Sequence, residues 1–316
     1  MGLFILKKKL ENLELWIDAK RKDIVFEGSD NAILRGMKVT HHKSVDSKKA
    51  VLIVNGRGEN LDQYNELYFD IACAIGADVY SYDHRGQGYS SRLVLEDRFR
   101  GHVESYDDYV EDLDRFYKNF IAPGNYEEFY IVAHSMGGAI AVLWACENED
   151  KLDGIFMSAP MFELKSPVPE FIARPALSVL SAFGFSKSYI IGSPGKPSIG
   201  PFKTNKLTRC PVRHELMCEN NLYDDGAISL VRPTNKWALA SYEATDKIKK
   251  NIHKLKDVKG IIFQAGEEQY IKNEAHIELS PEHWDVVSFP NDYHQLFHAP
   301  ENTRAIILDR IIESMI

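Results

Sequence analysis

A single short stretch restricts what this chain can fold into more than any other part of it. Residues 129–143 read FYIVAHSMGGAIAVL, an apolar run suited to a buried strand that passes through Ser135 and two glycines into an apolar helix. A serine at the exit of a buried strand, followed by residues almost without side chains, predicts one of two structures. It is either a simple helix cap or a nucleophile elbow, the strained turn that holds a serine hydroxyl above a sheet.

Composition limits the class of protein and of partner. The 316 residues are 44% hydrophobic, which is enough to bury a large core, and the net charge is −8. An acidic chain without a basic patch lacks the electrostatic footprint of a nucleic-acid binder, so no nucleic-acid partner is expected. The four scattered cysteines indicate neither a disulfide framework nor a zinc site, and they favour a reducing, cytoplasmic location. These are Cys73, Cys146, Cys210 and Cys218.

The N-terminal residues predict an amphipathic helix. Leu3, Leu6, Leu10 and Leu13 lie near one helical face, and such a face usually docks on the protein's own body. Weak adsorption to a membrane surface is the alternative, which would make the protein peripheral at that surface. The apolar run is too short to cross a bilayer, and the lysines follow it in the wrong order for a signal peptide.

The order of predicted elements indicates an α/β fold. Residues 23–27 and 33–41 are typical of an antiparallel pair of strands, and after them apolar strands alternate with amphipathic helices. This alternation predicts a mostly parallel central sheet with helices on both faces. It stops between residues 161 and 232 and then resumes. We therefore expect a core built from residues 1–160 and 233–316, with residues 161–232 inserted as a lid.

Polar residues gather directly after the predicted strands, where open parallel sheets place their functional groups. These residues are 55–59, 83–88, 134–138, 265–268 and 291–294. They supply a serine, a carboxylate and a histidine in that chain order, which is the order found in α/β-hydrolases. A base such as His294 can take the proton of the Ser135 hydroxyl, which is otherwise a weak nucleophile, while the carboxylate fixes the imidazole tautomer.

The same chemistry needs backbone N–H groups for the oxyanion of a tetrahedral intermediate. Two glycines after Met136 let the turn close tightly, so the Met136 N–H is one expected donor. Gly56 gives the first strand-to-helix loop similar freedom, and the N–H of Arg57 is the second expected donor. Glu59 is expected to brace this loop.

Six motifs carry a family resemblance: NGRGEN, DHRGQGYSS, GHVESYDDYVEDL, AHSMGGA, SAPMFE and DYHQLF. In this order the chain resembles the monoacylglycerol lipase-like α/β-hydrolases, and most closely their bacterial lysophospholipase branch, over most of its length. The resemblance implies an α/β-hydrolase fold with a lid. It also implies hydrolysis of the carboxylic ester of a single-chain lipid, a lysophospholipid or monoacylglycerol, through an acyl-enzyme on Ser135, with no metal and no organic cofactor.

The sequence departs from that family's pattern at three positions. Ala133 stands where the elbow motif has its first glycine, and a methyl group is the smallest possible change there. Asn55 stands where many relatives have histidine, which leaves the backbone donors untouched. The acid is usually aspartate, but the segment QAGEEQYIKN contains none. The position that aligns is Glu268, with Glu267 as its rival.

Two alternatives to a lipid esterase stay open. One is a general short-chain carboxylesterase. The other is a non-catalytic binding protein on the same fold, in which Ser135 is only a helix cap and His294 an ordinary turn histidine. His298 is the substitute if His294 is not the base. The sequence sets neither the oligomeric state nor the head group of the lipid.

The insertion has an apolar part and a polar part. Its apolar run at residues 171–185 is either ordinary core or a wall for an acyl chain. In the polar part, Arg209, Arg213 and His214 are candidates to face a phosphate head group, although a solvated face is the usual role of such charges.

Overall fold

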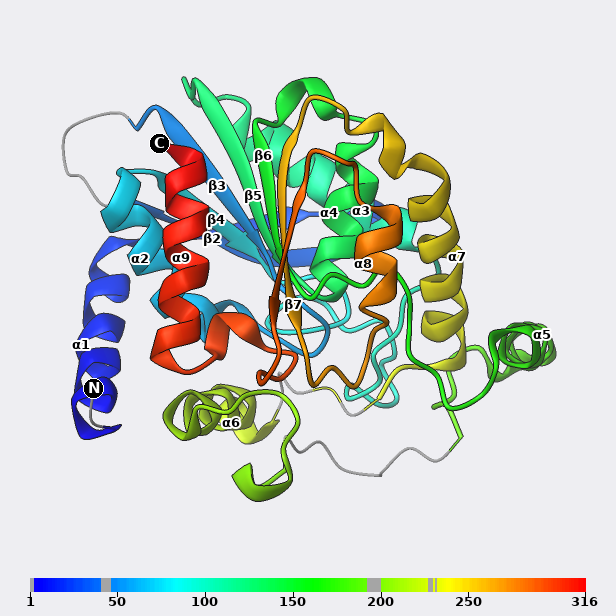
Figure 1. The fold of residues 1–316 in the computed structure, drawn as a ribbon. Coiled ribbons are helices and arrows are strands. Elements are labelled where there is room, and N and C mark those ends of the chain that lie inside the picture. The colour runs from blue at the N-terminus through cyan, green and yellow to red at the C-terminus, as the bar shows by residue number, and fades with distance from the viewer. Residues whose placement is uncertain (1–2, 41–46, 192–199, 227–229, 231) are drawn as a thin grey trace.

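The computed structural model describes residues 3–40, 47–191, 200–226, 230 and 232–316, and Figure 1 shows their arrangement. Within these residues the strands form one sheet of eight, in the order β1-β2-β4-β3-β5-β6-β7-β8. The strands are β1 (Arg21–Glu27), β2 (Ile33–Thr40), β3 (Lys49–Val54), β4 (Asp78–Tyr82), β5 (Glu128–His134), β6 (Gly154–Ser158), β7 (Lys259–Ala265) and β8 (Asp285–Phe289). The longer helices are α1 (Leu3–Lys20), α2 (Asn65–Ile75), α3 (Tyr106–Phe116), α4 (Met136–Ala145), α5 (Glu170–Leu180), α6 (Pro211–Gly226), α7 (Asn235–Asn251), α8 (Glu274–Leu279) and α9 (Glu301–Met315).

The sheet is parallel except at the end formed by β1 and β2. β1 pairs with β2, and β2 with β4, in antiparallel fashion, whereas the other neighbouring strands are parallel. Every residue of β4 and β6 is buried, because helices cover both faces at the centre of the sheet. The predicted α/β fold and the antiparallel pair are confirmed, although His41 lies outside the described residues.

Helices form a layer on each face of the sheet. α1, α2 and α9 pack on one face, and α3, α4, α7 and α8 pack on the other (Figure 1). Helix α2 ends where Gly76 takes up a left-handed backbone with φ 65°, which glycine adopts without a steric penalty. Helix α3 begins with a capping box, in which Ser105 and Asp108 each accept a backbone N–H at the helix start. These local signals determine where α2 ends and where α3 begins, and so where the neighbouring loops start.

The N-terminal helix docks on the body of the protein. Leu6, Leu10, Leu13 and Ile17 of α1 are buried, as one apolar helical face requires. The side chain of Leu3 lies outside the described residues. The described helices include none that is long and apolar enough to cross a membrane. The prediction that this face of α1 docks on the protein's own body is confirmed for Leu6, Leu10 and Leu13.

Helix α6, which lies between β6 and β7 in the chain, is tied to the helices of the sheet by a buried arginine. Arg213 of α6 donates hydrogen bonds of 2.8 Å to both carboxylate oxygens of Glu66 on α2, and one of 2.6 Å to Glu301 on α9. The side chain of Arg213 is only 1% exposed, and His214 beside it is buried as well. The expectation that these two residues face solvent or a head group is therefore wrong, because a charged partner from another helix reaches the arginine inside the protein.

Helix α5 lies beside α7, at the side of α7 that is away from the sheet (Figure 1). One face of α5 is apolar and exposed. Five apolar side chains of α5 and the helical turn after it are at least half exposed. They are Phe171, Ile172, Val179, Phe183 and Phe185. Phe171 and Phe183 are 78% and 77% exposed, respectively. The expectation of ordinary core is therefore wrong for these five side chains.

Candidate active site

Ser135 connects β5 to α4 through a strained turn. Its backbone has φ 50° and ψ −116°, a conformation that residues with side chains rarely adopt. The N–H of Ser135 donates to the backbone O of Ser158, and its own carbonyl accepts the N–H groups of Gly138 and Met161 at 3.0 and 2.9 Å. Neighbouring elements therefore hold the strain in place. The side chain of Ser135 makes no capping hydrogen bond within the described residues, which removes the helix-cap interpretation.

Two glycines allow α4 to start this close to the sheet. A Cβ atom on Gly137 would lie 2.3 Å from the backbone O of Val54, and one on Gly138 would lie 2.6 Å from the Cβ of Pro160. Backbone and proline ring have little freedom to move aside, so a side chain at either position would push the helix away. Ala133, in contrast, is fully buried in β5, and the sheet accommodates its methyl group.

A continuous series of hydrogen bonds runs from Ser135 through His294 to Glu268. The Oγ of Ser135 lies 2.9 Å from Nε2 of His294, and Nδ1 of His294 lies 2.6 Å from Oε2 of Glu268. Ser135 follows β5, Glu268 follows β7 and His294 follows β8, so three strand ends supply the three groups. With Nδ1–H donating to the carboxylate, Nε2 is left with its lone pair toward the Ser135 hydroxyl.

The carboxylate of Glu268 is buried but remains the anionic partner. Burial by itself raises the pKa of Glu268. The positive charge and hydrogen bond of His294 lower it more, and so do two backbone N–H groups. Those N–H groups, of Gln269 and Tyr270, donate to Oε1 at 2.8 and 2.7 Å. The net effect is a pKa below the ordinary glutamate value, so Glu268 stays ionised beside His294.

The rival residues named from the sequence lie elsewhere. Glu267 is partly exposed and forms an ion pair with Arg209 of the insertion, away from His294. His298 donates from Nε2 to the backbone O of Gln63 at 2.8 Å. Geometry therefore brings Glu268 and His294, and neither of the two rivals, to Ser135.

The two expected oxyanion donors belong to the start of α4 and to the loop after β3. Met136 is the first residue of α4, where a backbone N–H has no acceptor inside the helix. Arg57 follows Gly56 in the loop after β3. Within the described part of the chain neither N–H donates a hydrogen bond to protein, which leaves both free to bind a ligand oxygen.

Glu59 joins the Arg57 loop to the loop that carries His294. One carboxylate oxygen of Glu59 accepts the N–H of Gly56 and the hydroxyl of Tyr64. The other accepts a hydrogen bond from the side chain of Gln295, the neighbour of His294. The buried glutamate thus fixes both loops relative to each other, which goes beyond the expected bracing of one loop.

Two aromatic rings flank His294. The ring of His134 lies 4.7 Å from that of His294, and the ring of Tyr270 lies 5.0 Å from it. Burial lowers the pKa of His134 to about 4, so this histidine is neutral and packs beside the imidazole. Tyr270 escaped notice, as did Gln295, because a single aromatic or amide residue in a loop carries no pattern.

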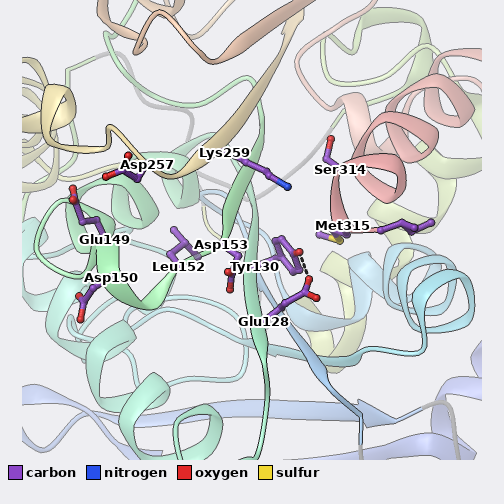
Figure 2. Close-up of a pocket in the computed structure, with 11 residues that line it drawn as sticks. Glu128, Tyr130, Glu149, Asp150, Leu152, Asp153, Asp257, Lys259, Ser314 and Met315 are labelled. Carbon is purple, nitrogen blue, oxygen red and sulfur yellow. Dashed lines mark hydrogen bonds between the residues drawn. The ribbon is translucent and has the colours of Figure 1, made fainter.

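A metal-binding cluster and a hollow elsewhere in the described structure were the other candidates for a site. Within the described residues, no group of three or more His, Cys, Asp or Glu side chains is arranged to hold a metal ion. Figure 2 shows a hollow lined by Glu128, Lys259 and Met315, among others. Glu128 and Lys259 are the first residues of β5 and β7, so the hollow lies at the opposite edge of the sheet from Ser135.

Comparison with protein families gives a match over most of the chain. The family described as serine aminopeptidase, S33 matches residues 45–301. Lysophospholipase L2 of Escherichia coli strain K12 is 32% identical over 309 residues, which cover 93% of this chain and 87% of that protein.

Two further proteins resemble this chain, one in part of its sequence and the other in its fold. Human monoglyceride lipase is 33% identical over 124 residues, covering 38% of this chain and 37% of its own length. A soluble variant of monoglyceride lipase from Saccharomyces cerevisiae, solved in complex with a substrate analogue, superposes with a TM-score of 0.71. That superposition covers 93% of this chain and 94% of the yeast chain at 17% identity, so it concerns the fold alone.

Proposed function

The chain belongs to the serine aminopeptidase, S33 family, as an α/β-hydrolase of the monoacylglycerol lipase-like group near the bacterial lysophospholipases, and we propose that it hydrolyses the carboxylic ester of a single-chain lipid. The substrate class is a lysophospholipid or a monoacylglycerol. The similarity to the E. coli lysophospholipase over most of both chains supports this class.

One observation carries the proposed chemistry. Ser135, on its strained turn, is hydrogen-bonded to His294, and His294 is hydrogen-bonded to Glu268. In the proposed reaction the Ser135 oxygen attacks the ester carbonyl carbon while Nε2 of His294 takes the hydroxyl proton. The oxyanion that forms accepts the backbone N–H groups of Arg57 and Met136. Glu268 holds the imidazole and stabilises its positive charge.

The second half of the reaction releases the two products. His294 passes its proton to the glycerol oxygen, the carbon–oxygen ester bond breaks, and the acyl group stays on Ser135. A water molecule then attacks the acyl-enzyme, His294 takes one of its protons, and the free fatty acid leaves with Ser135 restored.

A panel of substrates tests this proposal. We expect kcat/KM for p-nitrophenyl esters to rise by about tenfold or more from acetyl to dodecanoyl, since each buried methylene contributes about 0.8 kcal/mol. Lysophospholipids and monoacylglycerols should also be cleaved, as measured by release of fatty acid. Aminoacyl p-nitroanilides are the matched control, because aminopeptidase is the activity in the family's description. A flat chain-length profile would instead assign a general carboxylesterase, and preferred cleavage of the anilides would assign a peptidase.

The insertion at residues 161–232 is proposed to act as the lid, with α5 as the part that meets lipid. The exposed apolar side chains on α5 and its following turn form a patch that water solvates poorly. A lipid esterase acts where lipid surfaces are present, so the proposed partner of this patch is a lipid surface. The contact would be peripheral. The four cysteines are free thiols, which supports a cytoplasmic location.

Replacing two phenylalanines tests the membrane contact. Phe171→Asp with Phe183→Asp should lower the rate on lysophospholipid in vesicles by about tenfold or more, because each phenylalanine contributes about 1.5–3 kcal/mol when it leaves water. Hydrolysis of soluble p-nitrophenyl butyrate should change less than about twofold. Ile306→Asp on α9, which replaces a half-exposed apolar residue on the opposite face, is the control. An equal loss on both substrates, or the same loss in the control, would argue against the contact.

A further inference from the structure

Gln87 is a buried glutamine whose amide faces the loop that carries Arg57. It belongs to the segment GQG in the loop after β4, and its side chain is only 2% exposed. Gly86 and Gly88 on either side of it have φ 82° and 55°, the left-handed backbone that glycine adopts without a steric penalty. The chain therefore turns sharply on both sides of Gln87, whose side chain lies inside the protein.

Hydrogen bonds hold this turn in place. The N–H of Gln87 donates to the carbonyl of His84 at 3.2 Å. Asp83, which is fully buried, accepts the N–H of Tyr89 at 2.8 Å and the amide of Asn55 at 3.1 Å. The glutamine side chain thus starts from a fixed base, as a group that positions another group must.

The amide of Gln87 is hydrogen-bonded at both of its ends to the backbone of the Arg57 loop. Nε2 donates to the carbonyl of Gly56 at 2.8 Å and to that of Glu59 at 3.2 Å. Oε1 accepts the N–H of Gly58 at 3.2 Å. Reversing the amide would bring its oxygen against two carbonyls and its NH₂ group against an N–H, so the hydrogen-bond network determines which end is the donor.

These hydrogen bonds control the direction of the proposed oxyanion donor. The carbonyl of Gly56 and the N–H of Arg57 belong to one planar, trans peptide group, so they point in opposite directions. A hydrogen bond that holds the carbonyl therefore also sets where the N–H points. The N–H of Gly58 belongs to the next peptide group, so Gln87 holds the peptide planes on both sides of the Arg57 Cα atom.

The peptide group between Gly56 and Arg57 lies close to the Ser135 turn. A Cβ atom on Gly56 would lie 2.9 Å from Cδ2 of His134, the residue before Ser135. A Cβ atom on Gly137, two residues after Ser135, would lie 2.5 Å from the carbonyl oxygen of the residue before Gly56. A rotation of this peptide group would therefore redirect the donor relative to Ser135.

Glu59 holds a different peptide group of the same loop. Its carboxylate accepts the N–H of Gly56, which belongs to the peptide group between Asn55 and Gly56. That bond does not restrain the following peptide group, because the backbone of a glycine rotates more freely than that of any other residue. Gln87 supplies the restraint that Glu59 cannot.

We propose that Gln87 is a positioning residue that orients the N–H of Arg57 toward the oxyanion of the tetrahedral intermediate. This role rests on the function proposed above. Gln87 acts without touching the substrate, because its amide is buried and both ends of the amide are bonded to the protein. The oxyanion forms only as the reaction proceeds, so the orientation of the donor contributes to turnover and little to the binding of substrate.

Gln87→Met tests this role through its effect on kcat. Methionine has a similar length and shape but offers no N–H donor. For p-nitrophenyl butyrate we expect kcat to fall by about 10- to 100-fold while KM changes less than about threefold, since the lost interaction belongs to the transition state. An unchanged kcat, or a loss confined to KM, would overturn the role of Gln87.

Gln87→His tests whether the donor is what matters. Histidine can present a ring N–H at about the same reach as Nε2 of glutamine, so it should lose less of kcat than Gln87→Met does. Melting curves establish that both variants are folded. An equal loss of kcat in the two folded variants would overturn the role of the donor.

Two inhibitors with the same chain separate the orientation of the donor from a loss of packing. The Ser135 oxygen adds to the carbonyl carbon of 1,1,1-trifluorooctan-2-one while His294 takes the hydroxyl proton, and the carbonyl electron pair moves to its oxygen. The product carries an oxyanion like that of the intermediate. Octan-2-ol has no carbonyl and cannot undergo this addition.

The two inhibition constants give the decisive comparison. In Gln87→Met the inhibition constant of the ketone should rise by about the same factor as kcat falls, and that of the alcohol should change less than about twofold. If the ketone binds the variant as tightly as the unmodified protein, or if both inhibitors are weakened equally, the role of Gln87 is refuted.

Gln264→Met is the matched control. This glutamine of β7 is also buried, and its Nε2 donates to the backbone O of Asn273 at 2.7 Å. The strands β5 and β6 separate β7 from β3 and its loop. The control should lower the melting temperature about as much as Gln87→Met, yet leave kcat and both inhibition constants within about threefold. A matching loss of kcat would mean that loosening of the core reduces turnover, which would overturn the role of Gln87.

The unmodified protein and Ser135→Ala test the proposed function separately. If the unmodified protein does not hydrolyse the ester, or if Ser135→Ala hydrolyses it as fast, the proposed function is wrong and Gln87 has no oxyanion to serve. If the unmodified protein is active and Gln87→Met is equally active, only the role of Gln87 is wrong.

Discussion

Ser135→Ala is expected to lower kcat for ester hydrolysis by about 10⁴- to 10⁶-fold, the range observed when the nucleophile of a serine–histidine–acid set is removed. The hydroxyl is the only group of the series that can form the acyl-enzyme. Its loss leaves the protein fold intact, because the side chain makes no capping bond and the turn is held by backbone hydrogen bonds. The melting temperature should therefore change little. Hydrolysis of p-nitrophenyl butyrate and covalent labelling by a fluorophosphonate measure the effect.

The control for Ser135→Ala is Ser314→Ala, which removes a hydroxyl from the exposed surface of α9. This variant should keep full activity and full labelling. If the Ser135 variant retains a tenth of the activity or still reacts with the fluorophosphonate, the nucleophile is another residue.

Glu268→Gln is expected to lower kcat by about 10³- to 10⁴-fold. The two backbone N–H groups that now donate to Oε1 would hold the oxygen of the new amide. Its NH₂ group would then face Nδ1 of His294, which has to become an acceptor. The imidazole would carry its proton on Nε2 and could not take the proton of Ser135. A steady-state rate comparison at neutral pH measures the loss.

Glu267→Gln provides the matched control one residue away. It removes only the partly exposed ion pair with Arg209, so kcat should change less than about threefold. A ranking in which the Glu267 variant is the more damaged would transfer the role of the acid to that residue. Mild effects in both variants would place the acid elsewhere.

The fold and the approximate position of the site follow from local patterns. Alternating apolar strands and helices predict a parallel sheet, and a parallel sheet brings its carboxyl strand ends to one edge. Ser135 and His294 lie 159 residues apart in sequence, yet the order of strands is sufficient to predict that they lie near each other. Each of these predictions of a strand, a helix or a strand end needs only the residue pattern of a single segment.

Burial of charged residues could not be predicted in this way. Arg213 stands in a polar helix, and its type indicates a solvated position. Its partner Glu66 is 147 residues away on α2, and no local pattern connects the two. Arg57, which is partly buried, presents a related difficulty, because the contacts of its guanidinium with Gly101 and Trp237 bring together three distant segments.

The exposed apolar face of α5 was missed for a related reason. Periodicity shows that Phe171 and Phe183 belong to an apolar stretch, and in most helices another element covers such side chains. Whether a covering element exists is a property of the whole chain. Here α7 covers one side of α5, and the other side remains open.

The ion pair between Arg213 and Glu66 also bears on how such enzymes can be recombined. An insertion between two strands looks like a cassette that evolution or an engineer can exchange while the remainder stays constant. In this protein the cassette and the scaffold share one buried pair of charges. A graft of residues 161–232 from a relative without the arginine would leave Glu66 with less of its compensating charge. Breaking a buried pair in this way costs about 3–5 kcal/mol, a large share of the about 5–15 kcal/mol that keeps a typical domain folded. Chimeras in this family should therefore tolerate exchange only when α2, and with it the residue at position 66, is inherited from the same parent as the insertion.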